Sequence, residues 1–245
     1  MKILQPRQSG PRESGHMRIK WLVEKYQGNF RGYDEIREKG VVPYEKVVFF
    51  ENLLLNEGID LIWTLVCGGA GTPFDNANAR IGVGDGGLTS LTGTLTFTNG
   101  SATVTGSSTA FSTEIAAGDE IQLDADGVLY RVKSVESDTS LTLENLYAET
   151  GGSGAGSKTS PTETGLAGTN KAFKAMDSGY PTYGSSQKAV FRSTFGGTEA
   201  NFTWNEFTVV NGADDTATNL NRKVQNLGTK ASGTTWTLTV EIILQ

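Results

Sequence analysis

The side chains that most often carry enzyme chemistry are scarce, because the 245 residues include one histidine, His16, and one cysteine, Cys67. A Ser-His-Asp or Cys-His site needs a histidine held beside its nucleophile, and His16 lies in an N-terminal stretch interrupted by Pro and Gly. One His and one Cys cannot supply the usual ligands of zinc. Cys67 is interpreted as a thiol in a reducing compartment or as a small buried apolar residue. We expect no catalytic residues, no metal site and no cofactor.

Carboxylates are the remaining route to catalysis or ion binding. The run Asp124-Ala-Asp-Gly127 resembles half of a calcium loop but lacks the downstream ligands, so a hairpin turn is favoured. Asp214 and Asp215 lie in a Gly- and Asn-rich stretch, where acids usually form solvated turns. Glu199 and Glu206 would have to converge in a groove to make a polysaccharide-degrading enzyme, and no spacing requires this.

Glycines and aromatic residues offer two binding alternatives. The run Gly82-Val-Gly-Asp-Gly86 lacks the Gly-Lys-Ser/Thr of a phosphate loop, so it predicts a tight turn. Phe202 and Trp204 share one face of a predicted strand, where core packing is favoured over a sugar-binding platform. The run Tyr180-Pro-Thr-Tyr183 predicts a rigid exposed turn. Trp204, Tyr180 and Tyr183 are kept as candidate partner or glycan contacts.

Composition and charge divide the chain before any motif does. None of its 30 threonines precedes Thr64, and residues 1–40 hold nine Lys or Arg against five acids, a net charge of +4. The whole chain carries −6, so the remaining residues carry −10. A basic segment on an acidic body suits contact with an acidic surface, although an ordinary solvated tail explains the charge equally well. The acidic body disfavours nucleic acid.

Residues 1–44 are predicted to form an extended basic docking arm, with a short helix around residues 34–39. Five aromatic side chains occur within residues 21–44, more than a mere linker needs, and glycines interrupt the segment. Such a segment cannot close a core by itself, and aromatic side chains are common interface anchors. The side chains expected to bind a partner are Arg18, Lys20, Trp21, Lys25, Tyr26, Arg31 and Tyr33.

The apolar residues of segment 45–66 recur mostly at spacings of three and four, which predicts one substantial helix. The glycine-rich run Cys67–Gly71 ends it. The longest apolar stretch, Ile59–Cys67, is far shorter than the roughly 20 residues that span a bilayer. The N-terminus is also too broken by Pro, Gly and charge for a signal peptide, so we expect a soluble protein without a membrane partner.

The rest of the chain predicts strands and turns, so the fold class is mainly β, with a sandwich or barrel-like body. Residues 91–159 form a small barrel-like module that ends in the Gly/Ser tract Thr150–Ser160, with Asn99-Gly100 as its hairpin signal. Removing residues 91–159 would join the segments on either side of them into one ordinary loop. We therefore favour a module inserted into a main domain of residues 45–90 and 160–245 over one continuous sheet.

The predicted module contains the runs Gly100–Phe111, Ala117–Ile121 and Tyr130–Leu143. These runs resemble a small β-module that recurs in structural proteins of tailed bacteriophages. The flanking runs resemble phage virion proteins in the same way, and they are Arg80–Asp85, Asn201–Glu206, Leu220–Lys223 and Gly228–Leu238. From first run to last, the resemblance spans about two thirds of the chain. It implies a class of particle component rather than one activity.

The resemblance implies a non-enzymatic virion structural protein assembled in the host cytoplasm. The favoured role is a decoration or cement protein that binds the outer head shell through the arm and stabilises the assembled state. The expected partners are the major capsid protein and copies of the chain itself, as a trimer at threefold positions. The alternative is a tail, baseplate or receptor-binding component that contacts host glycan.

Overall fold

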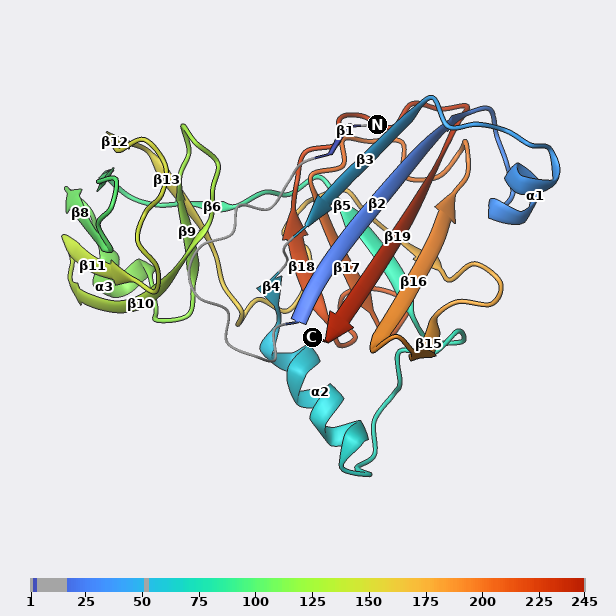
Figure 1. Cartoon of the computed structure of the whole chain (residues 1–245), viewed down its shortest axis with the longest axis horizontal. Coiled ribbons are helices and arrows are strands. Elements are labelled where there is room, and N and C mark those ends of the chain that lie inside the picture. Colours follow the sequence, from blue (N-terminus) through green and yellow to red (C-terminus); the bar gives the residue numbers. More distant parts are fainter. Residues whose placement is uncertain (1, 4–16, 51–52, 245) are drawn as a thin grey trace. The chain divides into compact units, whose positions relative to one another are not determined.

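The computed structural model describes residues 2–3, 17–50 and 53–244. Of the chain, 43% is strand and 9% is helical, which confirms the predicted fold class. The described residues form two compact units, a body of residues 2–3, 17–50, 53–87 and 164–244 and a module of residues 88–163 (Figure 1). The module had been predicted at residues 91–159, and the structure extends it by three or four residues at each end. None of the described helices is both long and apolar enough to cross a bilayer.

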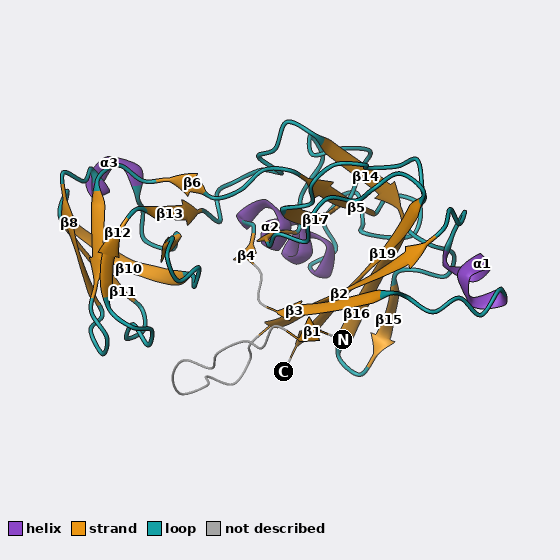
Figure 2. Cartoon of the chain, turned by 90° about the horizontal axis from the view of Figure 1, so that it is seen from above, coloured by secondary structure: helices purple, strands orange, loops and turns teal. Residues whose placement is uncertain are grey.

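The body is built from two sheets. The first has six strands in the order β1 (Lys2–Ile3), β3 (Glu45–Phe50), β2 (Met17–Gln27), β19 (Thr234–Leu244), β16 (Lys188–Phe195) and β15 (Thr182–Ser185). The second has five, in the order β14 (Lys171–Ala175), β5 (Arg80–Gly84), β17 (Glu206–Val210), β18 (Asn221–Val224) and β4 (Leu53–Leu54). Figure 2 shows the sheets as two layers.

The core of the body lies between these sheets. Trp21 of β2, Phe49 of β3 and Phe207 of β17 pack with ring centroids 5.7 to 5.9 Å apart. Trp236 and Leu238 of β19 extend this core and are almost fully buried, as the alternation of the predicted C-terminal strand indicated. Large apolar side chains from both inner faces thus hold the sandwich together.

The predicted docking arm is wrong for residues 17–44. Residues 17–27 form β2, which pairs with β19 along its whole length and with β3 on its other side. Ile19, Trp21 and Val23 alternate into the core, so the period-two pattern of a strand was present beneath the charges. The rest of the predicted arm, residues 1 and 4–16 with His16, lies outside the described residues.

The predicted helix over residues 45–66 is wrong in its first half. Residues 45–50 form β3, and the helix α2 covers only Asn56–Val66. Val47, Val48 and Phe49 are all buried, so β3 is covered on both faces. A strand buried on both faces shows no alternation, and a short apolar run of this kind cannot be distinguished from a helix by periodicity.

The second helix of the body, α1 (Tyr33–Glu38), matches the predicted short helix around residues 34–39. Its Ile36 packs with Tyr26 and Phe30 in a small buried cluster of its own. Tyr26 points away from the main core, because it lies an odd number of residues from Trp21 and Val23 and successive side chains of a strand point to opposite faces. Segment 28–44 is therefore part of the folded body.

The module has eight strands around one apolar core. In spatial order they are β12 (Gly152–Gly154), β7 (Thr94–Phe97), β8 (Thr103–Ser107), β11 (Ser140–Leu143), β10 (Tyr130–Ser137), β9 (Glu120–Leu123), β13 (Gly156–Thr159) and β6 (Thr89–Ser90). One short helix, α3 (Phe111–Glu114), contributes Phe111 to the core. The Asn99-Gly100 turn joins β7 to β8, as predicted, and the predicted Gly/Ser linker instead supplies β12 and β13.

Candidate functional site

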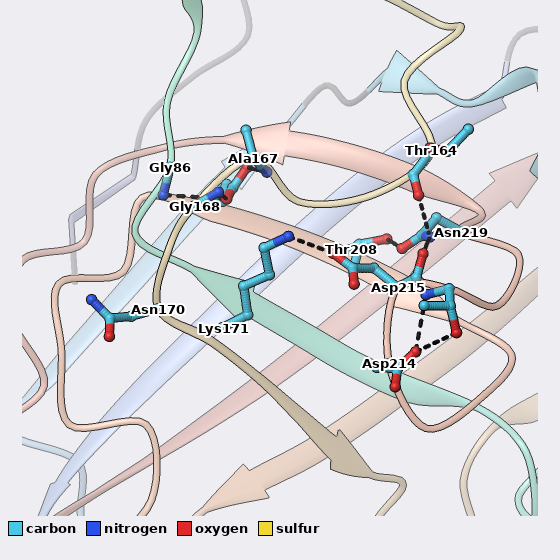
Figure 3. Close-up of polar contacts among 12 residues, drawn as sticks. Gly86, Thr164, Ala167, Gly168, Asn170, Lys171, Thr208, Asp214, Asp215 and Asn219 are labelled. Atoms are coloured by element: carbon cyan, nitrogen blue, oxygen red, sulfur yellow. Dashed lines mark hydrogen bonds and ion pairs between the residues drawn. The ribbon is translucent and has the colours of Figure 1, made fainter.

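The two loops that connect the body to its module lie together in the body. Gly84–Gly87 follows β5, and Thr164–Asn170 precedes β14. Strands β5 and β14 pair with Lys171 opposite Gly84, so the loops leave adjacent strand ends. We call these loops, with Glu206 of β17 and Arg222 of β18, the insertion base. Figure 3 labels Gly86, Ala167 and Gly168 of its loops.

Glu206 is the centre of the insertion base and is fully buried. Its carboxylate accepts backbone N–H groups from both loops: Gly86 at 3.2 Å, Ala167 at 3.0 Å and Gly168 at 2.6 Å. Arg222 donates to the same carboxylate from Nε at 3.0 Å and from Nη2 at 2.7 Å, and its Nη2 also donates to the Gly87 carbonyl. One buried ion pair therefore binds both connections at once.

The insertion base also depends on the absence of two side chains. A Cβ atom at Gly168 would lie 2.4 Å from the Gly86 nitrogen and 2.5 Å from the Asp85 carboxylate. A Cβ atom at Gly86 would lie 2.3 Å from the Gly168 nitrogen and 2.4 Å from Glu206 Oε1. The two backbones approach this closely only because both residues are glycine.

Further polar contacts surround the two loops. Asp85 accepts the side-chain and backbone N–H groups of Asn170, at 2.6 and 2.9 Å, and these bonds hold the pKa of Asp85 below its usual value. The fully buried Asn219 donates to the Thr164 carbonyl at 3.1 Å. Lys171 pairs with Asp215 at 2.8 Å (Figure 3). These bonds connect the returning loop to β5 and to the turn after β17.

The insertion base has the chemistry of a structural joint rather than of a catalytic centre. The carboxylate of Glu206 accepts five hydrogen bonds and is fully buried. Glu199 pairs with Lys174 at 2.5 Å, whereas Glu206 pairs with Arg222. Among the described residues, no group of three or more His, Cys, Asp or Glu side chains is placed to hold a metal ion.

The acidic turns have the contacts expected of turn formers. Asp126 accepts the backbone N–H of Val128 at 3.0 Å and the hydroxyl of Tyr147. Asp214 accepts the backbone N–H of Thr216 at 3.0 Å and the Thr216 hydroxyl at 2.6 Å, and these bonds lower the pKa of Asp214. Each carboxylate stabilises its own turn.

The residues predicted to contact a partner through the arm are distributed over the body. Lys25 is buried, where its Nζ donates to the Leu227 carbonyl, pairs with Glu45 at 2.8 Å and lies 4.3 Å from the ring centroid of Trp236. Trp21 and Tyr26 are buried too, and burial raises the pKa of the Tyr26 phenol above its usual value. Arg18 and Arg31 stay exposed, and Lys20 and Tyr33 are half-buried.

Tyr33 and Tyr180, two further predicted contacts, are half-buried and stack on Arg192. The guanidinium carbon lies 3.8 Å from the Tyr33 ring centroid and 4.1 Å from that of Tyr180. Asp177 accepts Arg192 Nε at 2.9 Å, and burial raises the pKa of its carboxyl group despite this bond. The cluster fastens α1 to the outer face of the six-stranded sheet.

Trp204 is not a sugar-binding platform. It is fully buried, its indole N–H donates to the Ala200 carbonyl at 2.9 Å, and its ring packs against Phe195 and Trp236. Tyr183 keeps 76% of its surface exposed and is the one candidate glycan contact that stays free of the core. Cys67 is exposed, so its interpretation as a buried apolar residue is wrong.

Helix α2 carries an exposed apolar surface. Gly58 is its only buried residue, whereas Trp63 and Val66 are 61% and 69% exposed. Next to it lies a pocket of about 550 Å³, lined mainly by Ile62, Phe74, Ala189, Phe191, Leu220 and Ile242. The spacing of apolar residues by three and four along α2 is visible in the sequence. That spacing does not show which apolar side chains of the helix pack against the body and which stay exposed.

The central residues of the insertion base escaped the sequence analysis. Glu206 was considered as one member of an acid pair with Glu199 and, like Arg222, as part of a phage-like run. Glu206 and Arg222 lie on neighbouring strands, because β17 and β18 pair with each other across the turn that joins them. Comparison of the chain with family models, curated proteins and solved structures finds no match, so the site is interpreted from its own geometry.

Proposed function

We propose that this protein is a non-enzymatic structural component of a tailed-bacteriophage virion, specifically a decoration protein of the head shell. The observation that carries the proposal is the insertion base, in which one buried ion pair holds both ends of a separately cored module. Such a joint suits a protein whose work is to carry a second β-unit on a stable body. The phage-like runs lie on both sides of this joint.

The use of the acidic groups supports the non-enzymatic part of the proposal. Glu206 is saturated with donors, and Asp177 is bonded to Arg192 and Thr194. A general acid or base needs a proton-accepting position that faces substrate. These buried carboxylates instead fix loops and strands, so their role in the proposal is structural.

The mode of shell binding differs from the one predicted from charge. Residues 17–44 belong to the sandwich, so shell binding in this proposal uses the folded surface of the body rather than an extended arm. A protein that binds only the assembled shell stabilises it by mass action. The glycan-binding alternative is less well supported, because Trp204 is in the core and Tyr180 stacks on Arg192.

The proposal is tested on purified virions and on heads that lack the protein. We expect antibody labelling over the head, and stoichiometric binding of the added full chain to such heads. A variant in which a short Gly/Ser linker replaces residues 88–163 is expected to bind equally well, because the module is the carried unit. Labelling over the tail, or a full chain that binds no heads, would overturn the decoration role.

A further inference from the structure

Helix α2 exposes apolar side chains where a surface helix normally presents polar ones. Its first turn is fixed to the body, because the Leu55 N–H donates to the Leu220 carbonyl at 3.1 Å and Glu57 accepts the Asn219 N–H at 2.7 Å. Beyond that turn, Trp63 and Val66 are exposed. Exposed apolar surface of this kind marks a contact with another molecule.

Gly58 explains why α2 is anchored at this end. A Cβ atom there would lie 2.5 Å from the Leu220 Cα atom and 2.7 Å from the Asn219 carbonyl oxygen. The glycine lets the first turn pack directly on the backbone before β18. The helix is thus held at a fixed position, with its last two turns exposed.

The pocket beside α2 continues the same apolar surface. Ile62 of the helix lines the pocket, together with Phe74, Phe191, Leu220 and Ile242 from the body. Val66 follows Ile62 by four residues, so the wall of the pocket and part of the exposed apolar surface lie on the same face of α2. The rim is the β15–β16 turn, residues 184–188.

The charges of the two parts are complementary. The charged residues of α2 are Glu57 and Asp60, and the helix has no Lys or Arg. Among the described residues that line the pocket, Lys188 is the one with a charged side chain. Its side chain is 37% exposed, and its distance to Glu241 is a loose 4.0 Å, so it can bind another carboxylate.

We propose that the occupant is a second copy of this chain, bound through α2 in a two-fold dimer. Each copy places Trp63 and Val66 in the pocket of the other, with Asp60 near Lys188 of the second copy. The contact is two-fold because the helix face and the pocket of each copy are contiguous. When the helix of the first copy enters the pocket of the second, the helix of the second copy therefore lies beside the pocket of the first. The inference does not depend on a virion location.

Sedimentation velocity of the full chain over a range of concentrations tests the proposal. We expect a species of twice the 26.1 kDa chain mass, and we expect Trp63→Ala to weaken dimerisation at least about tenfold, as for a central aromatic anchor. Leu146→Ala is the matched control, since Leu146 is also 61% exposed but lies in the module. It should leave the dimer unchanged.

Charge reversal gives a second test that separates contact from folding. Asp60→Lys and Lys188→Glu should each weaken the dimer, and the double variant should restore it, with thermal melting used to confirm that each variant folds. A monomer at every soluble concentration overturns the proposal, as does a dimer that Trp63→Ala leaves intact. A monomer whose pocket binds an apolar dye would identify a small apolar ligand as the occupant instead.

Discussion

The core of the module joins strands that are close in sequence, whereas the core of the body joins the two ends of the chain. In the module, β7 pairs with β8 and β10 with β11 across short turns. In the body, β2 pairs with β19, and the Phe30 N–H donates to Thr235 Oγ1 from 205 residues away. The module can therefore form from local contacts, but the body requires both ends of the chain.

The two regions also differ in how they bury charge. The body encloses the Glu206–Arg222 pair almost completely, with side chains 0% and 1% exposed. The module's Lys158–Asp119 pair leaves the lysine partly exposed. A fully buried pair is a strong constraint because either partner alone is costly to bury. We therefore expect the body and the module to unfold in two separate transitions that respond differently to the loss of a charged side chain, and calorimetry can resolve them.

The largest effect is expected from Glu206→Ala, which leaves Arg222 buried without its carboxylate and three loop N–H groups without their acceptor. We expect a loss of about 3–5 kcal/mol in the free energy of unfolding of the body, with the module transition unchanged. The matched control is Glu144→Ala, since Glu144 pairs with Arg131 at the surface of the module. That exposed pair should contribute less than about 1 kcal/mol. Equal losses in both variants would refute the role of the insertion base.

A slightly smaller effect is expected in the module from Leu141→Ala. Leu141 of β11 is fully buried in the module core, so the variant leaves a cavity and should cost about 2–5 kcal/mol. The module transition should shift to lower temperature while the body transition stays in place. If both transitions move together, the two units unfold as one, and the module does not fold independently of the body.

A moderate effect is expected from Gly168→Ala, because the added Cβ would lie 2.4 Å from the Gly86 nitrogen. The backbone of one loop has to move, at a cost of about 1–3 kcal/mol to the body. Gly87→Ala is the control, as no atom lies within 4 Å of its added Cβ. Chemical denaturation of both variants measures the difference, and a Gly168→Ala protein as stable as Gly87→Ala would contradict the close approach.

The smallest effect is a pH dependence of the body that originates at Lys230. This side chain is fully buried, donates to the Gly196 carbonyl at 2.7 Å, and has its pKa lowered by burial from 10.5 to about 8. Between these values the unfolded chain binds more protons than the folded one, so the contribution of Lys230 to stability rises with pH. The slope is at most about 1.4 kcal/mol per pH unit.

The measurement for Lys230 compares the wild-type chain with Lys230→Met in denaturant at about pH 8 and about pH 10. The stability of the wild type relative to the variant should increase toward the higher pH. Other titrating groups cancel in this comparison because both chains contain them. Identical pH slopes for the two chains would show that Lys230 does not carry the effect.

The module was largely predictable because its signals are local. The Asn99-Gly100 turn, the alternating strands around it and the boundaries near residues 91 and 159 all follow from neighbours in sequence. The body was predicted in class and in its C-terminal strand, but not at its N-terminal end. The threonine-free opening was interpreted as lying outside the sheet, whereas β2 is a central strand with lysine and glutamate on it.

The error at β2 has a physical cause. Lys25 and Glu24 look solvated in the sequence, yet both are buried, because Glu45 and Lys46 of β3 neutralise them across the sheet. A charged side chain is acceptable inside a protein when a partner from elsewhere in the chain satisfies it. The charge count of residues 1–40 therefore does not by itself define an arm.

The sequence by itself determined that the protein is mainly β, that a separate module interrupts its body, and that histidine and thiol chemistry is scarce. These properties follow from composition and from patterns within a few residues. Only the tertiary structure decided that β2 is central, that Glu206 and Arg222 hold both connections to the module, and that α2 exposes its apolar side chains. Each of these depends on contacts between segments that are distant in the chain, such as β2 with β19, Gly86 with Glu206 and Glu57 with Asn219. Contacts over such separations leave no local pattern in the sequence.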